Sequence, residues 1–136
     1  MAQCTVSHHG PCLTRGLYGK GLSGSIPTSI GALPELRFLD LSRNQLTGPL
    51  PPSFANPGGL EDLDLSYNQL SGSIPADYSR LAGLLRLRLN DNQLSGAIPE
   101  DMLPAMSNVK IFLLHNNQLT GSIPAKINML LPLEQL

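Results

Sequence analysis

The strongest constraint on the fold of this chain is an internal repeat with a period of 24 residues. An asparagine, a glycine and a proline recur at this step in constant register. These markers are Asn44, Asn68, Asn92 and Asn117; Gly24, Gly48, Gly72, Gly96 and Gly121; and Pro27, Pro51, Pro75, Pro99 and Pro124. All three series share one slip of a single residue, near Leu103 and Pro104. Self-similarity at a fixed period is typical of solenoids, in which each repeat stacks on its neighbours.

Between the markers the repeat reads L-x-x-L-x-L-x-x-N-x-L-x-G-x-I-P. The copies lie at residues 36–51, 60–75, 84–99 and 109–124, with half a copy at 22–27. In the first full copy Leu39 and Leu41 alternate with polar or larger residues, which predicts a short strand with one buried face. The return segments are short and interrupted by Pro and Gly, which favours 3₁₀ or irregular turns over long helices.

The repeated asparagine stands where each predicted strand ends. A buried side-chain amide there can satisfy backbone groups of its own turn and of the neighbouring coil. We therefore expect Asn44 and its copies to hold consecutive coils together.

Composition excludes several functional classes. The chain has 136 residues, enough for one domain, and a net charge of −1, which gives no reason to expect nucleic acid as a partner. No apolar stretch approaches the roughly 18 residues of a membrane span. The first residues do not have the pattern of a signal peptide, so we expect either a cytoplasmic or organellar protein or a secreted chain whose leader has been removed.

The repeat resembles that of the plant-type leucine-rich-repeat family, found in plant receptor kinases and polygalacturonase-inhibiting proteins. The resemblance implies an α/β right-handed solenoid with a parallel sheet on its concave side and a second short strand near each LxGxIP segment. It divides the chain into an N-terminal cap with a degenerate first coil at residues 1–20 and repeats at 21–136 that end within a repeat, at Leu133 and Leu136.

Cys4 and Cys12 are the chain's two cysteines. The family's N-terminal cap carries a closely spaced disulfide, and the resemblance implies the same bond between these residues. Two reduced thiols are the alternative, since the compartment is not known. His8 and His9 lie between them, but their spacing matches no standard structural zinc site, so we expect no metal.

Alternation along the strands places a mixed set of side chains on the predicted concave face, and adjacent coils stack them into columns, such as Asp40, Asp64, Arg88 and Leu113. The candidate partner-binding residues are Phe38, Asp40, Asp62, Asp64, Tyr67, Arg86, Arg88, Ile111, Leu113 and His115. Aromatic and apolar groups among charges suit protein recognition, whereas mutual neutralisation of Asp and Arg on a solvated sheet is the alternative. The face measures only ~400 Å², against roughly 800 Å² per partner in a standard interface, which favours an accessory or co-receptor role.

Three functions follow from these observations. The first is a non-catalytic module that binds a protein or peptide through the concave face. The second is a structural subunit docked into a larger assembly that caps the C-terminal edge. The third is binding of ice or polysaccharide by the repeated Thr47, Ser71, Ser95 and Thr120, which the repeat aligns in one column. No cluster of acidic, His or Ser residues interrupts the repeat, so we expect no enzymatic activity and no cofactor.

Overall fold

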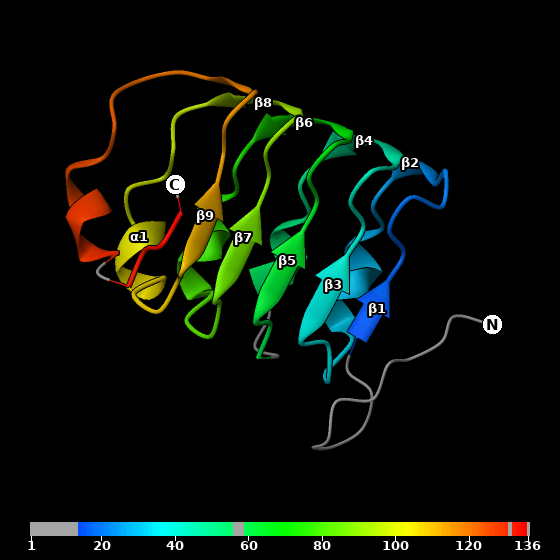
Figure 1. Cartoon of the computed structure of the whole chain (residues 1–136), viewed down its shortest axis with the longest axis horizontal. Helices are drawn as coiled ribbons and strands as arrows, with labels where there is room; N and C mark the ends of the chain where they lie inside the picture. The colour runs from blue at the N-terminus through cyan, green and yellow to red at the C-terminus, as the bar shows by residue number, and fades with distance from the viewer. Residues whose placement is uncertain (1–13, 56–58, 131, 136) are drawn as a thin grey trace.

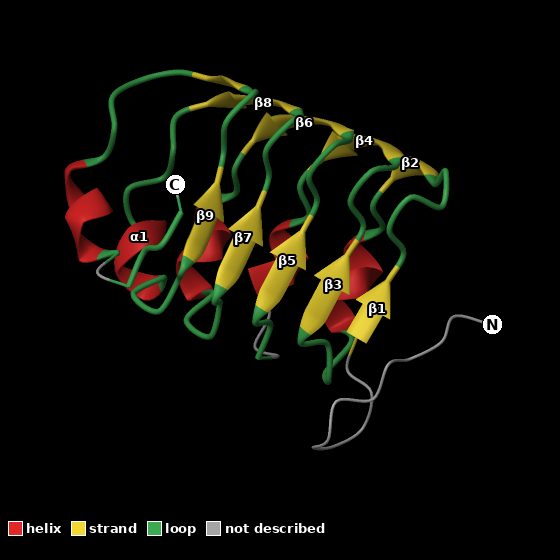
Figure 2. Ribbon diagram, viewed as in Figure 1, coloured by secondary structure: helices red, strands yellow, loops and turns green. Residues whose placement is uncertain are grey.

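The computed structural model describes residues 14–55, 59–130 and 132–135. Its coils stack side by side, and each contributes a strand to each of two parallel sheets (Figures 1 and 2). The first sheet has the order β1-β3-β5-β7-β9, with strands β1 Thr14–Gly16, β3 Phe38–Asp40, β5 Asp62–Asp64, β7 Arg86–Arg88 and β9 Ile111–Leu113. The second has the order β10-β8-β6-β4-β2, with strands β2 Ser23–Ser25, β4 Gln45–Pro49, β6 Gln69–Ser73, β8 Gln93–Gly96 and β10 Gln118–Leu119. This confirms the predicted leucine-rich-repeat solenoid and its second strand per coil.

Short helices form the return segments, behind the first sheet in the view of Figure 2. Those of 3₁₀ type are η1 Thr28–Ala32, η2 Pro52–Ala55, η3 Ala76–Arg80 and η4 Ala125–Met129, as predicted. The exception is α1, Met102–Ala105, which lies at the slip in the repeat. There the Met106 N–H donates to the Met102 carbonyl at 3.2 Å. The extra residue thus widens a 3₁₀ turn into an α turn, which needs more residues per turn.

Leucines of the repeat fill the space between the sheets and the helices. Leu63 and Leu65, which flank the outward-facing Asp64, are fully buried, and so is Leu70 on the second sheet. Burying one such side chain stabilises the fold by about 1.5–3 kcal/mol. Tyr78 of η3 also lies inside, where its hydroxyl donates to the Pro51 carbonyl at 3.3 Å. Burial raises the pKa of this phenol, so the side chain stays neutral.

The repeated asparagines connect consecutive coils, as predicted. Asn92 is the clearest case, with its side chain buried. Its Oδ1 accepts a hydrogen bond from the Leu70 N–H of the preceding coil at 3.0 Å. Its Nδ2 donates to the Leu65 carbonyl of that coil at 3.0 Å and to the Leu89 carbonyl of its own coil at 3.1 Å. Asn44, Asn68 and Asn117 make the corresponding bonds.

The residue before each asparagine adopts the left-handed conformation. Arg43, Tyr67, Asp91 and Asn116 have φ angles of 54–56°. This conformation is uncommon for residues other than Gly, although Asn and Asp adopt it more readily. The four positions are equivalent in the repeat and mark the turn out of the first sheet.

The second sheet pairs in a register different from that of the repeat. Thr47 lies opposite Gln69, and Pro49 lies opposite Ser71. Each strand is therefore shifted by two residues against its neighbour. This corrects the prediction that Thr47, Ser71, Ser95 and Thr120 form one column across the strands. Ladder pairing, rather than the sequence period, decides which side chains lie opposite one another.

The two ends of the chain bear on the remaining predictions. Gln135 pairs with Ile111, so the chain begins a further strand beside β9. Cys4 and Cys12 lie outside the described residues, as does most of the predicted cap, so both remain predictions. Within the described part, none of the helices has the length and apolar character needed to cross a membrane.

Replacing Asn92 with Ala should destabilise the fold by about 3 kcal/mol, because the buried Leu70 N–H and two carbonyls lose their partner. Urea unfolding followed by circular dichroism measures this loss. The exposed neighbour Gln93 serves as the control, since Gln93→Ala should change the unfolding free energy by less than about 0.5 kcal/mol. Equal losses in the two variants would contradict the proposed role of the amide.

Candidate interaction face on the first sheet

The outward side chains of the first sheet form columns across the strands. Phe38, Asp62, Arg86 and Ile111 lie opposite one another in turn, and so do Asp40, Asp64, Arg88 and Leu113. All eight are half-buried, because neighbouring side chains on the same face cover them. The structure therefore brings together the eight strand residues that the sequence placed on this face.

Charges at the centre of this face neutralise one another. Arg86 Nη1 contacts Asp62 Oδ2 at 2.9 Å, and Arg88 Nη1 contacts Asp62 Oδ1 at 3.2 Å. Arg88 also lies 3.7 Å from Asp64 Oδ2. Two arginines thus face two aspartates with no net charge. Here the structure supports the neutralising alternative, so these arginines are not a free site for an anion.

The first two full repeats share a second polar contact. The Ser42 hydroxyl donates to Asp40 Oδ1 at 2.5 Å, and the Ser66 hydroxyl donates to Asp64 Oδ1 at 2.6 Å. The backbone N–H of each serine donates to the same oxygen at 3.0 Å. These bonds fix the aspartate side chains against the end of the strand.

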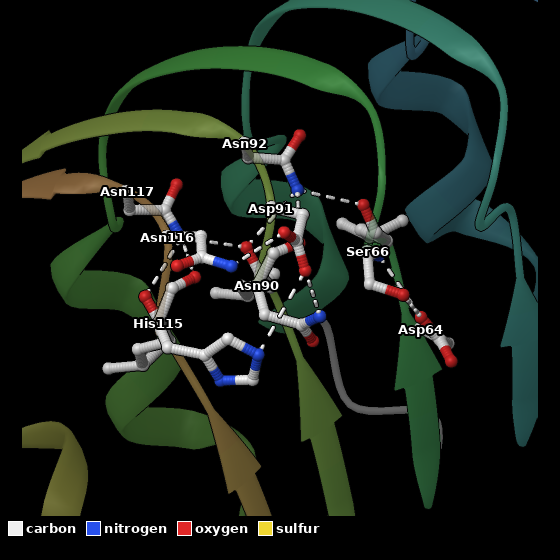
Figure 3. A network of polar contacts seen from close by, with 11 residues as sticks. Asp64, Ser66, Asn90, Asp91, Asn92, His115, Asn116 and Asn117 are labelled. Carbon is white, nitrogen blue, oxygen red and sulfur yellow. Dashed lines mark hydrogen bonds and ion pairs between the residues drawn. The ribbon is translucent and has the colours of Figure 1, made fainter.

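The third repeat has a different polar arrangement, shown in Figure 3. We call Asn90, Asp91, His115 and Asn116 the Asp91 cluster. Asn90 Nδ2 donates to Asp91 Oδ2 at 2.7 Å, and Asn116 Nδ2 donates to Asp91 Oδ1 at 2.8 Å. His115 Nε2 lies 3.9 Å from Asp91 Oδ2. The hydrogen bond from Asn116, and then that from Asn90, lowers the pKa of the Asp91 carboxyl, so the carboxylate is charged at neutral pH.

The two remaining predicted residues lie at the ends of strands rather than within them. Tyr67 is 45% exposed, and its ring lies 4.4 Å from the guanidinium carbon of Arg43, a cation–π contact. His115 belongs to the Asp91 cluster, and its side chain is 52% exposed. Both border the face on the side where the strands end.

Asn90, Asp91 and Asn116 were not among the candidate residues. Asn90 occupies the repeat position of Ser66, and Asp91 and Asn116 occupy that of Tyr67. The sequence pattern alone therefore assigned them only to the sheet face. The available signal was the change from Ser66-Tyr67 to Asn90-Asp91, which places an amide beside a carboxylate in the third repeat. Their mutual hydrogen bonds depend on the stacking of two coils.

The chemistry of this face is that of recognition. Among the described residues, no three His, Cys, Asp or Glu side chains are grouped so that they could hold a metal ion. The side chains offer apolar contact at Ile111 and Leu113, an aromatic ring at Tyr67, and fixed hydrogen-bonding groups. Such mixtures are typical of protein interfaces.

A model of the leucine-rich repeat family matches residues 34–94. Among solved structures, the leucine-rich-repeat ectodomain of the Arabidopsis thaliana membrane receptor kinase GASSHO1/SCHENGEN3, in complex with CASPARIAN STRIP INTEGRITY FACTOR 2, is 40% identical. It has a TM-score of 0.87, and the match covers 90% of this chain and 15% of that chain.

Two further structures are similar. The BIR3–SERK2 complex from Arabidopsis thaliana matches with 38% identity and a TM-score of 0.77, covering 82% of this chain and 60% of that chain. A plant ice-binding protein matches with 38% identity and a TM-score of 0.74, and the match covers 85% of this chain and 37% of that chain. The chain spans less than two thirds of each of these proteins. A comparison with curated protein sequences gives no match.

Arg88→Gln should lower the unfolding free energy by about 1 kcal/mol at low salt, because Asp62 and Asp64 lose a shared cation. At about 1 M NaCl the loss should shrink, since the screening length falls to about 3 Å. Urea unfolding at both salt concentrations measures the difference. Arg88→Lys, which keeps the charge, is the control and should lose less; a loss for Arg88→Gln that does not depend on salt would contradict the electrostatic account.

Proposed function

Because this chain belongs to the leucine-rich-repeat family of the plant type, we propose that it is an interaction module that binds a protein or peptide through the outer face of its first sheet. The observation that carries the proposal is the composition of that face. A neutral centre of paired Asp and Arg is bordered by an aromatic ring on one side and by half-buried Ile111 and Leu113 on the other. A few residues, often Trp, Tyr or Arg, supply most of the binding energy at protein interfaces, and the buried core of an interface is more apolar than its rim.

Two of the similar structures support a partner of this kind. One is a receptor ectodomain in complex with CASPARIAN STRIP INTEGRITY FACTOR 2, and another is a complex between BIR3 and SERK2. The small area of the face suits a contribution to a larger interface better than independent tight binding. A larger assembly that covers the C-terminal edge, where Ile123 and Met129 are exposed, remains an expectation compatible with this role.

The double variant Tyr67→Asn with Leu113→Asp tests this proposal. Asn occupies the position of Tyr67 in a later repeat, as Asn116, and Asp occupies that of Leu113 in an earlier one, as Asp64. Both changes should therefore be compatible with folding while they remove the aromatic and aliphatic contacts. The immobilised full chain is incubated with an extract of its native source, and retained proteins are identified by mass spectrometry.

A true partner should be retained by the wild type and by Arg80→Ala, a change at an exposed residue of η3, but not by the double variant. After purification, that partner should bind the double variant at least about tenfold more weakly, since hot-spot contacts are worth roughly 2 kcal/mol or more. Equal retention by all three chains, or no retention by the wild type, would refute the proposal.

We also infer a second candidate function, ice binding, for the outer face of the second sheet. The five strands of this sheet contain no charged residue, and exposed Gln45, Thr47, Gln69 and Ser73 line them. The similarity to a plant ice-binding protein points to the same possibility. The oblique register weakens it, because no hydroxyl column runs straight across the sheet: Thr47 lies opposite Gln69, whereas Ser73 lies opposite Ser95.

Ice shaping and thermal hysteresis of the purified chain test this second candidate. Wild type should show both activities, and Thr47→Lys should remove them by placing a charge on an uncharged face. The double variant of the first sheet should keep them in full, because its changes lie on the other face. Absence of ice shaping by the wild type would eliminate the candidate without affecting the first proposal.

A further inference from the structure

The third repeat differs from the first two in a way that creates an unsatisfied group. In the first two repeats a serine hydroxyl donates to an aspartate of its own strand, as Ser66 does to Asp64. In the third repeat Arg88 replaces the aspartate and Asn90 replaces the serine. Asn90 instead donates to Asp91, the next residue along the chain. The polar side chain at the end of this strand therefore donates to the following residue, and not to a residue of its own strand.

Asn90 is left with an unpaired acceptor. The residue is 4% exposed, and its Oδ1 has no hydrogen-bond partner within the described part of the chain. Figure 3 shows this oxygen on the side of the amide that faces away from Asp91. Reversing the amide would place the oxygen against the Asp91 carboxylate, so the present orientation is favoured. A buried acceptor without a donor costs about 1–3 kcal/mol.

Asp91 itself carries a charge without a strong cationic partner. Its hydrogen-bond donors Asn90 and Asn116 are neutral amides, and the hydroxyl of Tyr67, which also donates to it, is neutral as well. Asp62 and Asp64 on the same face each contact an arginine, whereas among the described residues the basic group nearest Asp91 is the largely exposed ring of His115 at 3.9 Å. The carboxylate is thus held rigidly, and 23% of the side chain remains accessible.

We propose that the Asp91 cluster is the anchoring site for a basic side chain, Arg or Lys, of a protein or peptide partner. This inference rests on the proposed function of the first sheet and names the chemistry of its partner. Guanidinium and ammonium groups carry a positive charge and several N–H donors, so one group can pair with the carboxylate and also donate to Asn90 Oδ1. An anionic group would be repelled by Asp91, and an apolar group would leave Asp91 without a counter-charge and Asn90 Oδ1 without a donor.

The surroundings of the cluster extend this description of the partner. His115 of the cluster and Tyr67 at its border are exposed, so these side chains can turn aside to admit the incoming group. The next strand presents Leu113 beside Arg88. The partner should therefore carry an apolar residue next to its basic one, as in the sequence Leu-Arg-Leu.

Nuclear magnetic resonance titration of the full, ¹⁵N-labelled chain tests the proposal. The probe is the peptide acetyl-Leu-Arg-Leu-amide, and its control is the same peptide with citrulline, which has nearly the shape of arginine but no charge. The arginine peptide should shift the side-chain NH₂ signals of Asn90 and Asn116 in a saturable manner. The citrulline peptide should bind at least about tenfold more weakly, the effect of about 1.4 kcal/mol.

Neighbouring repeats supply matched variants of the chain. Asp91→Asn introduces the residue found at the same position as Asn116, and Asn90→Ser introduces that found as Ser66. Each variant should reduce affinity for the arginine peptide at least about tenfold, with an amide spectrum that otherwise resembles that of the wild type. Asp77→Asn is the control, since Asp77 lies in η3 rather than on the first sheet, and it should leave the affinity unchanged.

Three results would overturn the proposal: no saturable shift at Asn90 and Asn116, equal affinity for the two peptides, or equal losses in Asp91→Asn and Asp77→Asn. The last would indicate general attraction to the acidic groups of the chain. If the two cluster variants fail to fold, the comparison of the two peptides on the wild type decides the question. Failure here is distinct from failure of the proposed function, which is measured on captured proteins rather than on a synthetic peptide.

Discussion

The hydrogen bonds of the repeated asparagines are the interaction on which the rest of the structure depends. Each coil buries too few leucines to be stable alone, and its turns leave backbone groups that water cannot reach. Asn92 satisfies such groups in two coils at once, because its Oδ1 accepts from Leu70 and its Nδ2 donates to Leu65 and Leu89. Stacking and local turn geometry are therefore stabilised by the same side chain, which explains why this position tolerates no variation among the four full repeats.

This rigid frame leaves the outward positions free to differ from one coil to the next. The first two repeats carry aspartates capped by serines, the third carries arginines, and the fourth carries Ile111 and Leu113. A charged group in one coil is in some cases neutralised by the next coil, as Asp64 is by Arg88. In other cases the next coil brings only a neutral partner, as Asn116 is for Asp91, and the charge stays available to a ligand. The binding properties of the face arise from these differences between repeats, while the repeat itself provides stability.

Two faces of the molecule differ in the kind of partner that they suit. The first sheet combines charges, apolar groups and an aromatic ring, which suits a protein or peptide. The second sheet is uncharged and lined with hydroxyl and amide groups. Because they belong to opposite ends of each repeat, a substitution on one face should leave the other unaffected. The similar structures include both receptor ectodomains and an ice-binding protein, so the same frame supports both uses.

The period of the sequence was sufficient to predict the solenoid, the strands of the first sheet, the 3₁₀ return segments and the inter-coil role of Asn44 and its copies, because each depends on residues at fixed spacing within one repeat. The strands of the second sheet were implied by the family resemblance. The opposite pairs on the first sheet, such as Asp64 and Arg88, followed for the same reason. The two-residue shift of the second sheet did not, because strand pairing responds to the path of the whole coil. The unpaired oxygen of Asn90 and the bond from Asn116 to Asp91 were likewise decided only by tertiary structure, since side-chain orientation in one coil depends on the donors that the next coil brings beside it.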